Sequence, residues 1–239
     1  RDSSTSRGLE MCIRDRFMTI SGILFDFDGT LANTTPLILH CFHQTFSHFY
    51  GKVPPDEKIL TTFGLPMPQA MLQLSGGDEA HLDELLTFYR TYQLSVHDEM
   101  IRPFPSVLAG CQRLKEKGIH SIIVTSKTNE TCERGLRCLG LSPYIEGVIG
   151  VRDTALHKPD PEPSLLALKK LGLSGEECLC VGDSPYDLVS GMRAGCRASV
   201  KVGWSSFDPI RFQQEIKPNY TIASLPELLP IIESLNQQR

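Results

Sequence analysis

The 239-residue sequence has no long apolar run, no cluster of basic residues and no closely spaced pair of metal-binding cysteines. No segment approaches the roughly 18 consecutive apolar residues that a membrane-spanning helix needs, and no segment has the pattern of a signal peptide. Lysine and arginine are scattered and the net charge is −4, which favours neither nucleic acid nor a membrane surface as a partner. We therefore expect a cytoplasmic protein that acts on a small soluble molecule; the sequence leaves its oligomeric state open.

The eight cysteines are dispersed, most of them through apolar segments, and none lies in a Cys-x-x-Cys pair, which is typical of a reducing compartment. Cys178 and Cys180 are two positions apart, so they are expected to face the same side of a buried strand. With 41% hydrophobic and 22% charged residues, the chain has the composition of an ordinary globular protein. Its length suits one large domain, or a domain that carries a smaller insertion.

Residues 1–17 differ from the rest because they are polar, rich in serine and arginine, and without helical or strand periodicity. We expect this segment to be a non-native or disordered extension. Met18, immediately before the first apolar segment, is the expected native start.

Short apolar runs that end in polar residues predict the strands of a parallel sheet. The predicted strands are 20–25, 121–124, 147–149, 178–181 and 198–202. Helical patterns at 106–118, 161–172 and 185–195 alternate with them, each opened by Ser or Pro and closed by Gly. This alternation predicts a doubly wound, Rossmann-like α/β fold, in which ligands bind beyond the carboxyl ends of the strands.

Residues 32–103 have a different character, with helical patterns at 36–50 and 79–92 and no convincing strand. We predict that they form an inserted, all-helical cap. The segments 18–31 and 104–239 then form the sheet domain, and Pro-rich residues 102–105 make a stiff return into it.

Two aspartates follow the first predicted strand. Asp26 and Asp28 place two carboxylates near one point, which suits a Mg²⁺ ion, and Asp26 could also attack phosphorus. The alternative is that Asp28-Gly29 is only a turn. Three later segments with similar chemistry weigh against that alternative.

Hydroxyl groups follow the second of these strands, at Thr125 and Ser126, where they could bind phosphate oxygens; a plain helix cap would use the same residue types. Lys158 could neutralise phosphoryl oxygens, although a lone loop lysine is usually solvated. Asp183 and Asp187 lie four apart across a helix start, where Asp183 suits a metal and Asp187 could pair with Lys158 or with a metal-bound water. Favourable interaction with the helix dipole would also account for Asp187.

These four segments, in this order and at these strand ends, resemble the four signature motifs of the haloacid dehalogenase superfamily. The resemblance implies that Asp26 is the nucleophile, Asp28 the general acid and base, Thr125 the phosphate-binding hydroxyl and Lys158 the charge-stabilising lysine. It also implies that Mg²⁺ is held by Asp26, by the backbone carbonyl of Asp28 and by the acidic pair Asp183 and Asp187. The implied reaction is hydrolysis of a small phosphorylated substrate or pyrophosphate through an aspartyl-phosphate.

Two subgroups of capped phosphatases look similar to this chain: phosphoglycolate phosphatases and the bacterial inorganic pyrophosphatase of the superfamily. His97-Asp98-Glu99 and residues 158–163 resemble the pyrophosphatase more, although the former is also typical of a solvated turn that closes a cap helix. A phosphosugar mutase and a non-catalytic binding module with the same fold are the alternatives. Thr30 after Asp28-Gly29 favours a phosphatase over a mutase.

Overall fold

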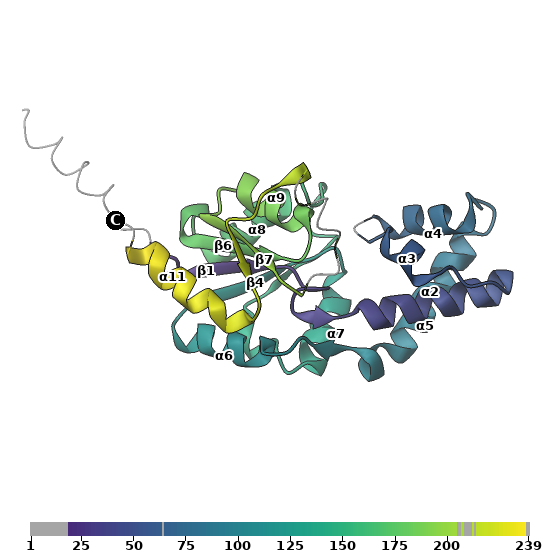
Figure 1. The fold of residues 1–239 in the computed structure, drawn as a ribbon, viewed down its shortest axis with the longest axis horizontal. Helices are drawn as coiled ribbons and strands as arrows, with labels where there is room; N and C mark the ends of the chain where they lie inside the picture. Colours follow the sequence, from purple (N-terminus) through teal and green to yellow (C-terminus); the bar gives the residue numbers. More distant parts are fainter. Residues whose placement is uncertain (1–18, 64, 205–206, 208–211, 213, 238–239) are drawn as a thin grey trace, which may run out of the picture.

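The computed structural model describes residues 19–63, 65–204, 207, 212 and 214–237, and it has two parts that lie side by side along the longest axis of the molecule (Figure 1). One part is a sheet covered by helices and the other is a group of four helices. The predicted extension at 1–17 and the predicted start at Met18 lie outside the described residues. Within the described ranges, no helix is both long enough and apolar enough to cross a membrane.

The sheet has six strands in the order β5-β4-β1-β6-β7-β8, and all neighbours in it pair in parallel. Its strands are β1 (Gly22–Phe25), β4 (His120–Val124), β5 (Val148–Ile149), β6 (Cys178–Gly182), β7 (Ala198–Val202) and β8 (Tyr220–Ile222). This confirms the predicted doubly wound fold. The sequence did not predict β8, because of its three residues only Ile222 is buried.

The side chains of each central strand alternate between two hydrophobic clusters, one on each face of the sheet. Ile23 and Phe25 point to one face, while Leu24 points to the other together with Cys178 and Cys180, so the two cysteines share a face as predicted. The first face is covered by α6 (Val107–Glu116), α7 (Asn129–Cys138) and α11 (Leu228–Gln237), and the second by α8 (Glu162–Leu171) and α9 (Pro185–Arg193). Strands buried on both faces read as continuous apolar runs, which is why the sequence located them.

The three predicted helices of the sheet domain, α6, α8 and α9, begin and end close to their predicted bounds, whereas no bounds were predicted for α7 and α11. Gly172 ends α8 with φ 69°, a left-handed conformation that glycine adopts without strain. Pro185 opens α9, where its missing N–H costs no hydrogen bond. Ser106 precedes α6 without capping it through its side chain; its Oγ instead accepts a hydrogen bond from the N–H of Leu225.

Four helices form the second part, α2 (Thr35–Tyr50), α3 (Asp56–Leu60), α4 (Met67–Ser75) and α5 (Leu82–Met100). They have a hydrophobic cluster of their own, centred on Leu37, Phe42, Met71 and Tyr89. The cap is helical, as predicted, but the predicted bounds of its last helix, 79–92, were wrong. The helix continues to Met100 because His97 is buried rather than part of a solvated turn.

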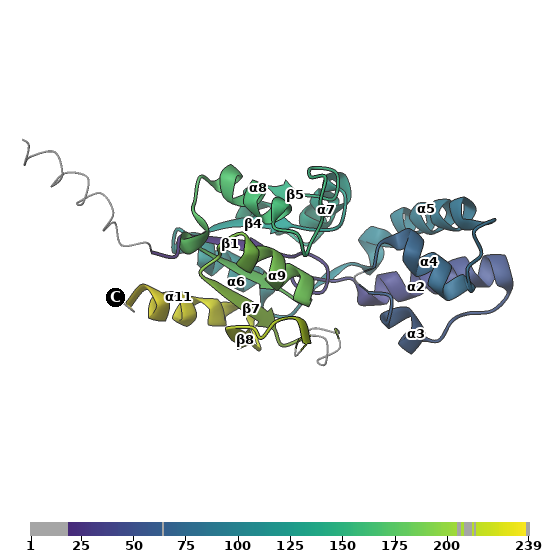
Figure 2. The same cartoon turned by 90° about the horizontal axis from the view of Figure 1, so that it is seen from above.

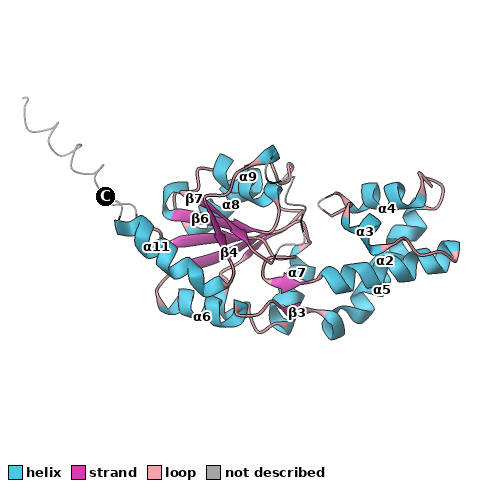
Figure 3. Ribbon diagram, in the orientation of Figure 1, coloured by secondary structure: helices cyan, strands magenta, loops and turns pink. Residues whose placement is uncertain are grey.

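The two connections between the sheet domain and the cap run together (Figure 2). They form a two-stranded antiparallel sheet from β2 (Ala32–Asn33) and β3 (Arg102–Pro103), which Figure 3 shows beside the amino-terminal end of α2. The sequence predicted no strand in this region, since two-residue strands leave no periodic pattern. The domain boundaries 18–31, 32–103 and 104–239 stay a prediction.

Candidate active site

Three predicted site residues follow directly from neighbouring strands of the sheet. Asp26 follows β1, Thr125 follows β4 and Asp183 follows β6. The N–H of Asp26 donates to the carbonyl of Val181 over 2.9 Å, which extends the strand pairing to the nucleophile candidate itself. The parallel pairing of these strands therefore carries the three side chains to one edge of the sheet.

Lys158 ties two of the acidic residues together. Its Nζ lies 2.8 Å from Asp26 Oδ1 and 2.5 Å from Asp187 Oδ1, and it donates to the carbonyl of Val124 over 2.9 Å. These three acceptors account for all three protons of the ammonium group. Only 8% of the Lys158 side chain is exposed, so the interpretation of this residue as a solvated loop lysine is wrong.

The carboxylates around Lys158 outnumber the positive charge. Asp26, Asp183 and Asp187 each offer an oxygen atom, and these atoms lie within 4.8 Å of one another. Burial, and secondly the charge of Asp187, raises the pKa of Asp26 to about 7, against the opposing effect of Lys158. Burial and then Asp26 likewise raise the pKa of Asp183 well above its usual range. We call Asp26, Lys158, Asp183 and Asp187 the Lys158 cluster.

The Lys158 cluster has the donor set of a site for a divalent cation. Three carboxylates against one ammonium leave an excess of two negative charges when all the acids are ionised, and hard oxygen ligands are those that Mg²⁺ prefers. The side chain of Asp28 is not part of this group of oxygens, because it lies beside Lys127. That position is compatible with the predicted contribution of Asp28 through its backbone carbonyl.

Glycines allow the loops of the site to approach each other closely. Gly29 has φ 80°, and a Cβ atom at this position would overlap the carboxylate of Asp183. A Cβ atom at Gly182 would overlap the side chain of Asp187 in the same way. The turn after Asp28 therefore has a second role, since it lets the first loop pack against the acid that follows β6.

The two predicted hydroxyl residues differ in their surroundings. Thr125 is buried and its Oγ1 accepts a hydrogen bond from the N–H of Lys127 over 3.1 Å, whereas Ser126 is exposed. Neither residue caps the following helix. Thr128 does so instead, by accepting a hydrogen bond from the N–H of Thr131. The alternative that Thr125 or Ser126 is a plain helix cap is therefore wrong.

Asp187 has two partners at once. Its Oδ2 accepts hydrogen bonds from the backbone N–H and the hydroxyl of Ser184 at the start of α9, over 2.9 and 2.7 Å. Its Oδ1 accepts from Lys158. The predicted pairing with Lys158 and a role at the helix start are therefore both present, and the cap of α9 holds the carboxylate in place for the lysine.

Sequence reasoning did not single out Lys127. Its Nζ lies 3.2 Å from Asp28 Oδ1, and only 12% of its side chain is exposed. A lysine that follows a strand end is usually solvated, so its type gave no signal. Its position directly after Thr125 and Ser126, which were both predicted to bind phosphate, could have drawn attention to it.

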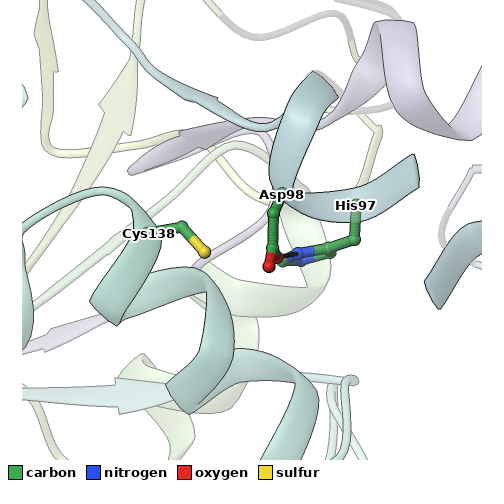
Figure 4. Close-up of side chains that lie close together, drawn as sticks. All are labelled: His97, Asp98 and Cys138. Carbon is green, nitrogen blue, oxygen red and sulfur yellow. Dashed lines mark hydrogen bonds and ion pairs between the residues drawn. The ribbon is translucent and has the colours of Figure 1, made fainter. Parts of the chain in front are cut away.

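A second cluster joins the cap to the sheet domain, and Figure 4 shows three of its side chains, from α5 and α7, pointing toward one another. Asp98 Oδ1 lies 2.8 Å from both His97 Nδ1 and Arg134 Nε, and Cys138 also bonds to this carboxylate. His97, Asp98 and Cys138 are types that bind metals, but the Arg134 guanidinium already supplies the positive charge. We call these four residues the Asp98 cluster.

Comparisons with known proteins agree with this geometry. The family model described as "Haloacid dehalogenase-like hydrolase" matches residues 23–201. A protein of Caldanaerobacter subterraneus subsp. tengcongensis, described as "Putative pyrophosphatase PpaX", is 38% identical over 220 residues, which are 92% of this chain and 98% of that protein. "Pyrophosphatase PpaX" of Bacillus mycoides is 34% identical, with 92% and 100% covered.

Solved structures with the same fold include one from Lactobacillus plantarum that is described as a "putative phosphoglycolate phosphatase". It is 27% identical, covers 90% of this chain and 100% of its own, and superposes with a TM-score of 0.77. The family match spans most of the chain and includes the residues that follow β1, β4 and β6. The chain belongs to the haloacid dehalogenase-like hydrolases.

Proposed function

We propose that this protein is a magnesium-dependent phosphohydrolase that transfers a phosphoryl group to Asp26 and then to water, and that inorganic pyrophosphate is its preferred substrate. The observation that supports the chemistry best is the Lys158 cluster, in which Asp26 lies at a strand end among more negative charge than Lys158 balances. An acid held in this way needs a cation before it can approach an anionic phosphate.

Each residue of the site has a separate part in the proposed reaction. Asp26 attacks phosphorus, and Asp28, two residues further along the loop, gives a proton to the leaving group and takes one from the water that follows. Lys158 orients Asp26 and offers positive charge to the phosphoryl oxygens, with Thr125 and Ser126 as hydroxyl donors. Asp187 holds Lys158 in position.

The carboxylates of Asp26, Asp183 and Asp187 and the backbone carbonyl of Asp28 are the groups that would hold Mg²⁺. The bound ion would reduce the repulsion between Asp26 and the substrate's phosphate. Chelation with EDTA is expected to remove the activity and added Mg²⁺ to restore it. Full activity in the chelated enzyme would overturn this part of the proposal.

The proposed substrate rests on the relatives that share most of this chain. Two of them, with 38% and 34% identity, carry the name pyrophosphatase, whereas the solved structure named for phosphoglycolate is 27% identical. The cap also supports a small substrate, because a helical domain above the strand ends restricts access by large phosphoproteins.

Phosphate release from pyrophosphate and from 2-phosphoglycolate, measured in parallel with Mg²⁺, tests the substrate. We expect a higher kcat/KM for pyrophosphate. A clear preference for 2-phosphoglycolate would replace pyrophosphate as the substrate and leave the chemistry at Asp26 intact. No hydrolysis of either compound, nor of a generic aryl phosphate, would contradict the proposed activity itself.

A further inference from the structure

Two lysines lie at the strand ends, and they differ in how fully their ammonium groups are used. Lys158 has three acceptors, Asp26, Asp187 and the carbonyl of Val124. Lys127 has one ion-pair partner among the described residues, Asp28 at 3.2 Å, and its Nζ makes no hydrogen bond to any of them. An ammonium group that is mostly buried and keeps free donors has capacity for a further anion.

The backbone around Lys127 is fixed. Its N–H donates to Thr125 Oγ1 over 3.1 Å, and its carbonyl accepts from the N–H of Val151 over 2.8 Å. The residue therefore starts from a defined point next to the phosphate-binding hydroxyl candidate. Its ammonium group reaches Asp28 from there and does not reach into the Lys158 cluster.

The surroundings of Lys127 place it on the side of the site that faces the cap. The positive charge of Lys127 acts on the thiol of Cys41, which lies on α2. Burial raises the pKa of Cys41 to about 12, and the charge of Lys127 opposes this rise. Asp28 in turn adds, after burial and Cys41, to the raised pKa of Tyr89 on α5. The pair of Lys127 and Asp28 is therefore close to residues of the cap as well as to the strand ends.

We propose that Lys127 binds the negatively charged leaving group of the substrate and so selects phosphates whose leaving group is an anion. This inference rests on the proposed function, because it places the leaving group next to Asp28, the proposed acid. The ligand class is a pyrophosphate or a phosphomonoester with a carboxylate close to the bridging oxygen. A neutral alcohol would gain nothing from this ammonium group.

The chemistry gives Lys127 a role distinct from that of Lys158. When Asp26 attacks the phosphorus atom, the bond to the bridging oxygen breaks and its electron pair stays on that oxygen, which takes a proton from Asp28. For pyrophosphate, the departing group is an orthophosphate whose remaining oxygens are negative. Lys127 neutralises these oxygens, while Lys158 faces the phosphoryl group that is transferred.

The second half of the reaction returns the enzyme to its starting state. Water attacks the phosphorus atom bound to Asp26 and gives a proton to Asp28, and the bond to the Asp26 oxygen breaks to release a second orthophosphate. Lys127 has no leaving group to neutralise in this step. Its effect is therefore confined to substrate binding and to the first transfer.

The test compares substrates with charged and uncharged leaving groups in Lys127→Met and Lys127→Arg. For Lys127→Met we expect kcat/KM for pyrophosphate to fall about 100-fold, as for the loss of one charge-assisted contact, and kcat/KM for phenyl phosphate to fall far less. The ratio of the two values should thus drop at least about 10-fold, and Lys127→Arg should restore most of it. Lys169→Met, an exposed lysine on α8, is the matched control and should leave the ratio unchanged.

An equal loss of kcat/KM for all substrates would overturn the inference, since it would mean that Lys127 only positions Asp28. A second measurement does not need turnover: calorimetric titration of pyrophosphate and of orthophosphate into Asp26→Asn, with and without Lys127→Met, in the presence of Mg²⁺. We expect Lys127→Met to weaken pyrophosphate binding about 10-fold or more and to affect orthophosphate much less. Equal weakening of both ligands would contradict the inference even if the proposed activity failed.

Discussion

The molecule contains two clusters in which a basic side chain meets aspartate, and they differ in the balance of charge and in the exposure of the carboxylates. In the Lys158 cluster, Asp26, Lys158 and Asp187 are buried and Asp183 is partly buried, and the pKa values of Asp26 and Asp183 are raised. In the Asp98 cluster His97 is buried, but about 49% of the Asp98 side chain is exposed, and hydrogen bonds from Arg134 and then His97 hold the pKa of Asp98 below its usual range. In the Lys158 cluster three buried or partly buried carboxylates face one ammonium group, whereas in the Asp98 cluster one carboxylate is paired with one guanidinium group.

This difference distinguishes a candidate active site, the Lys158 cluster, from a contact that only connects two parts of the structure, the Asp98 cluster. Acids that are buried together oppose folding unless a cation joins them, so their presence at a sheet edge indicates binding or catalysis. An exposed carboxylate that accepts several hydrogen bonds stabilises the contact between its donors, and it needs no further cation to balance its charge. Arg134 on α7 also donates to the carbonyl of Leu94 on α5, so the Asp98 cluster connects the sheet domain to the last helix of the cap.

The largest expected effect is on turnover. Asp26→Asn should lower kcat at least about 10⁴-fold, because the amide cannot form the phosphoryl-enzyme. The variant should remain folded, since it keeps the size of the side chain and removes one of the mutually repelling charges. Phosphate-release assays and thermal unfolding would measure both quantities.

Asp98→Asn is the matched control for this experiment, because it changes the same residue type in the other cluster. It should keep most of the activity. Substantial hydrolysis by Asp26→Asn, or an equal loss of activity in the two variants, would contradict the contrast between the clusters.

The next effect is on stability. Lys158→Met removes the cation that contacts Asp26 and Asp187, and leaving buried carboxylates unpaired should lower the free energy of unfolding by about 3 kcal/mol. Arg134→Met removes the cation of the exposed cluster and should cost much less, because water can solvate Asp98. Urea denaturation at pH 7 in the presence of EDTA compares the two. A similar loss in both variants would mean that burial does not distinguish the clusters.

A smaller effect is a pH dependence of opposite sign in the two clusters. Because the pKa of Asp26 is raised from 3.8 to about 7, the folded chain keeps a proton that the unfolded chain loses. In EDTA, the free energy of unfolding should therefore fall as the pH rises from about 4 to about 7. The lowered pKa of Asp98 acts in the other direction: its stabilisation is present above the unfolded pKa and is lost as the pH falls through the folded one.

Urea denaturation at pH 4.5, 6 and 7.5 would reveal the slope in the unmodified chain. Asp26→Asn should reduce the slope in the range from about 4 to about 7 and leave the part that comes from the raised pKa of Asp183. Asp98→Asn should lower stability by a similar small amount at all three pH values and leave the slope unchanged, because the stabilisation by ionised Asp98 is present at each of them. An unchanged slope in Asp26→Asn would assign the proton to another group.

The smallest expected effect concerns the link between the cap and the sheet domain. Asp98→Asn should speed amide hydrogen exchange near the end of α5 and lower the melting temperature only slightly, because half-exposed ion pairs contribute little. Arg134→Met should have the same effect on the same amides, and the double variant should add little to either. Fully additive effects of the two substitutions would show that the pair does not act as a unit.

The sequence by itself determined the sheet domain and the position of its chemistry. Strands buried on both faces are short apolar runs, and Asp26, Thr125 and Asp183 each follow such a run. Since parallel strands end at one edge, their convergence followed from topology rather than from any contact. The pairing of Lys158 with Asp187 was one of two predicted roles for that acid, and the geometry contains it.

Only the tertiary structure decided the parts that depend on packing between distant segments. The ion pair of Asp98 with Arg134 spans 36 positions, and the burial of His97 that extends α5 to Met100 arises in the same place. The ion pair of Lys127 with Asp28 likewise joins residues that are nearly a hundred positions apart in the sequence. Local periodicity reports which face of an element is apolar, but it carries no information on which charged side chains meet when the elements pack.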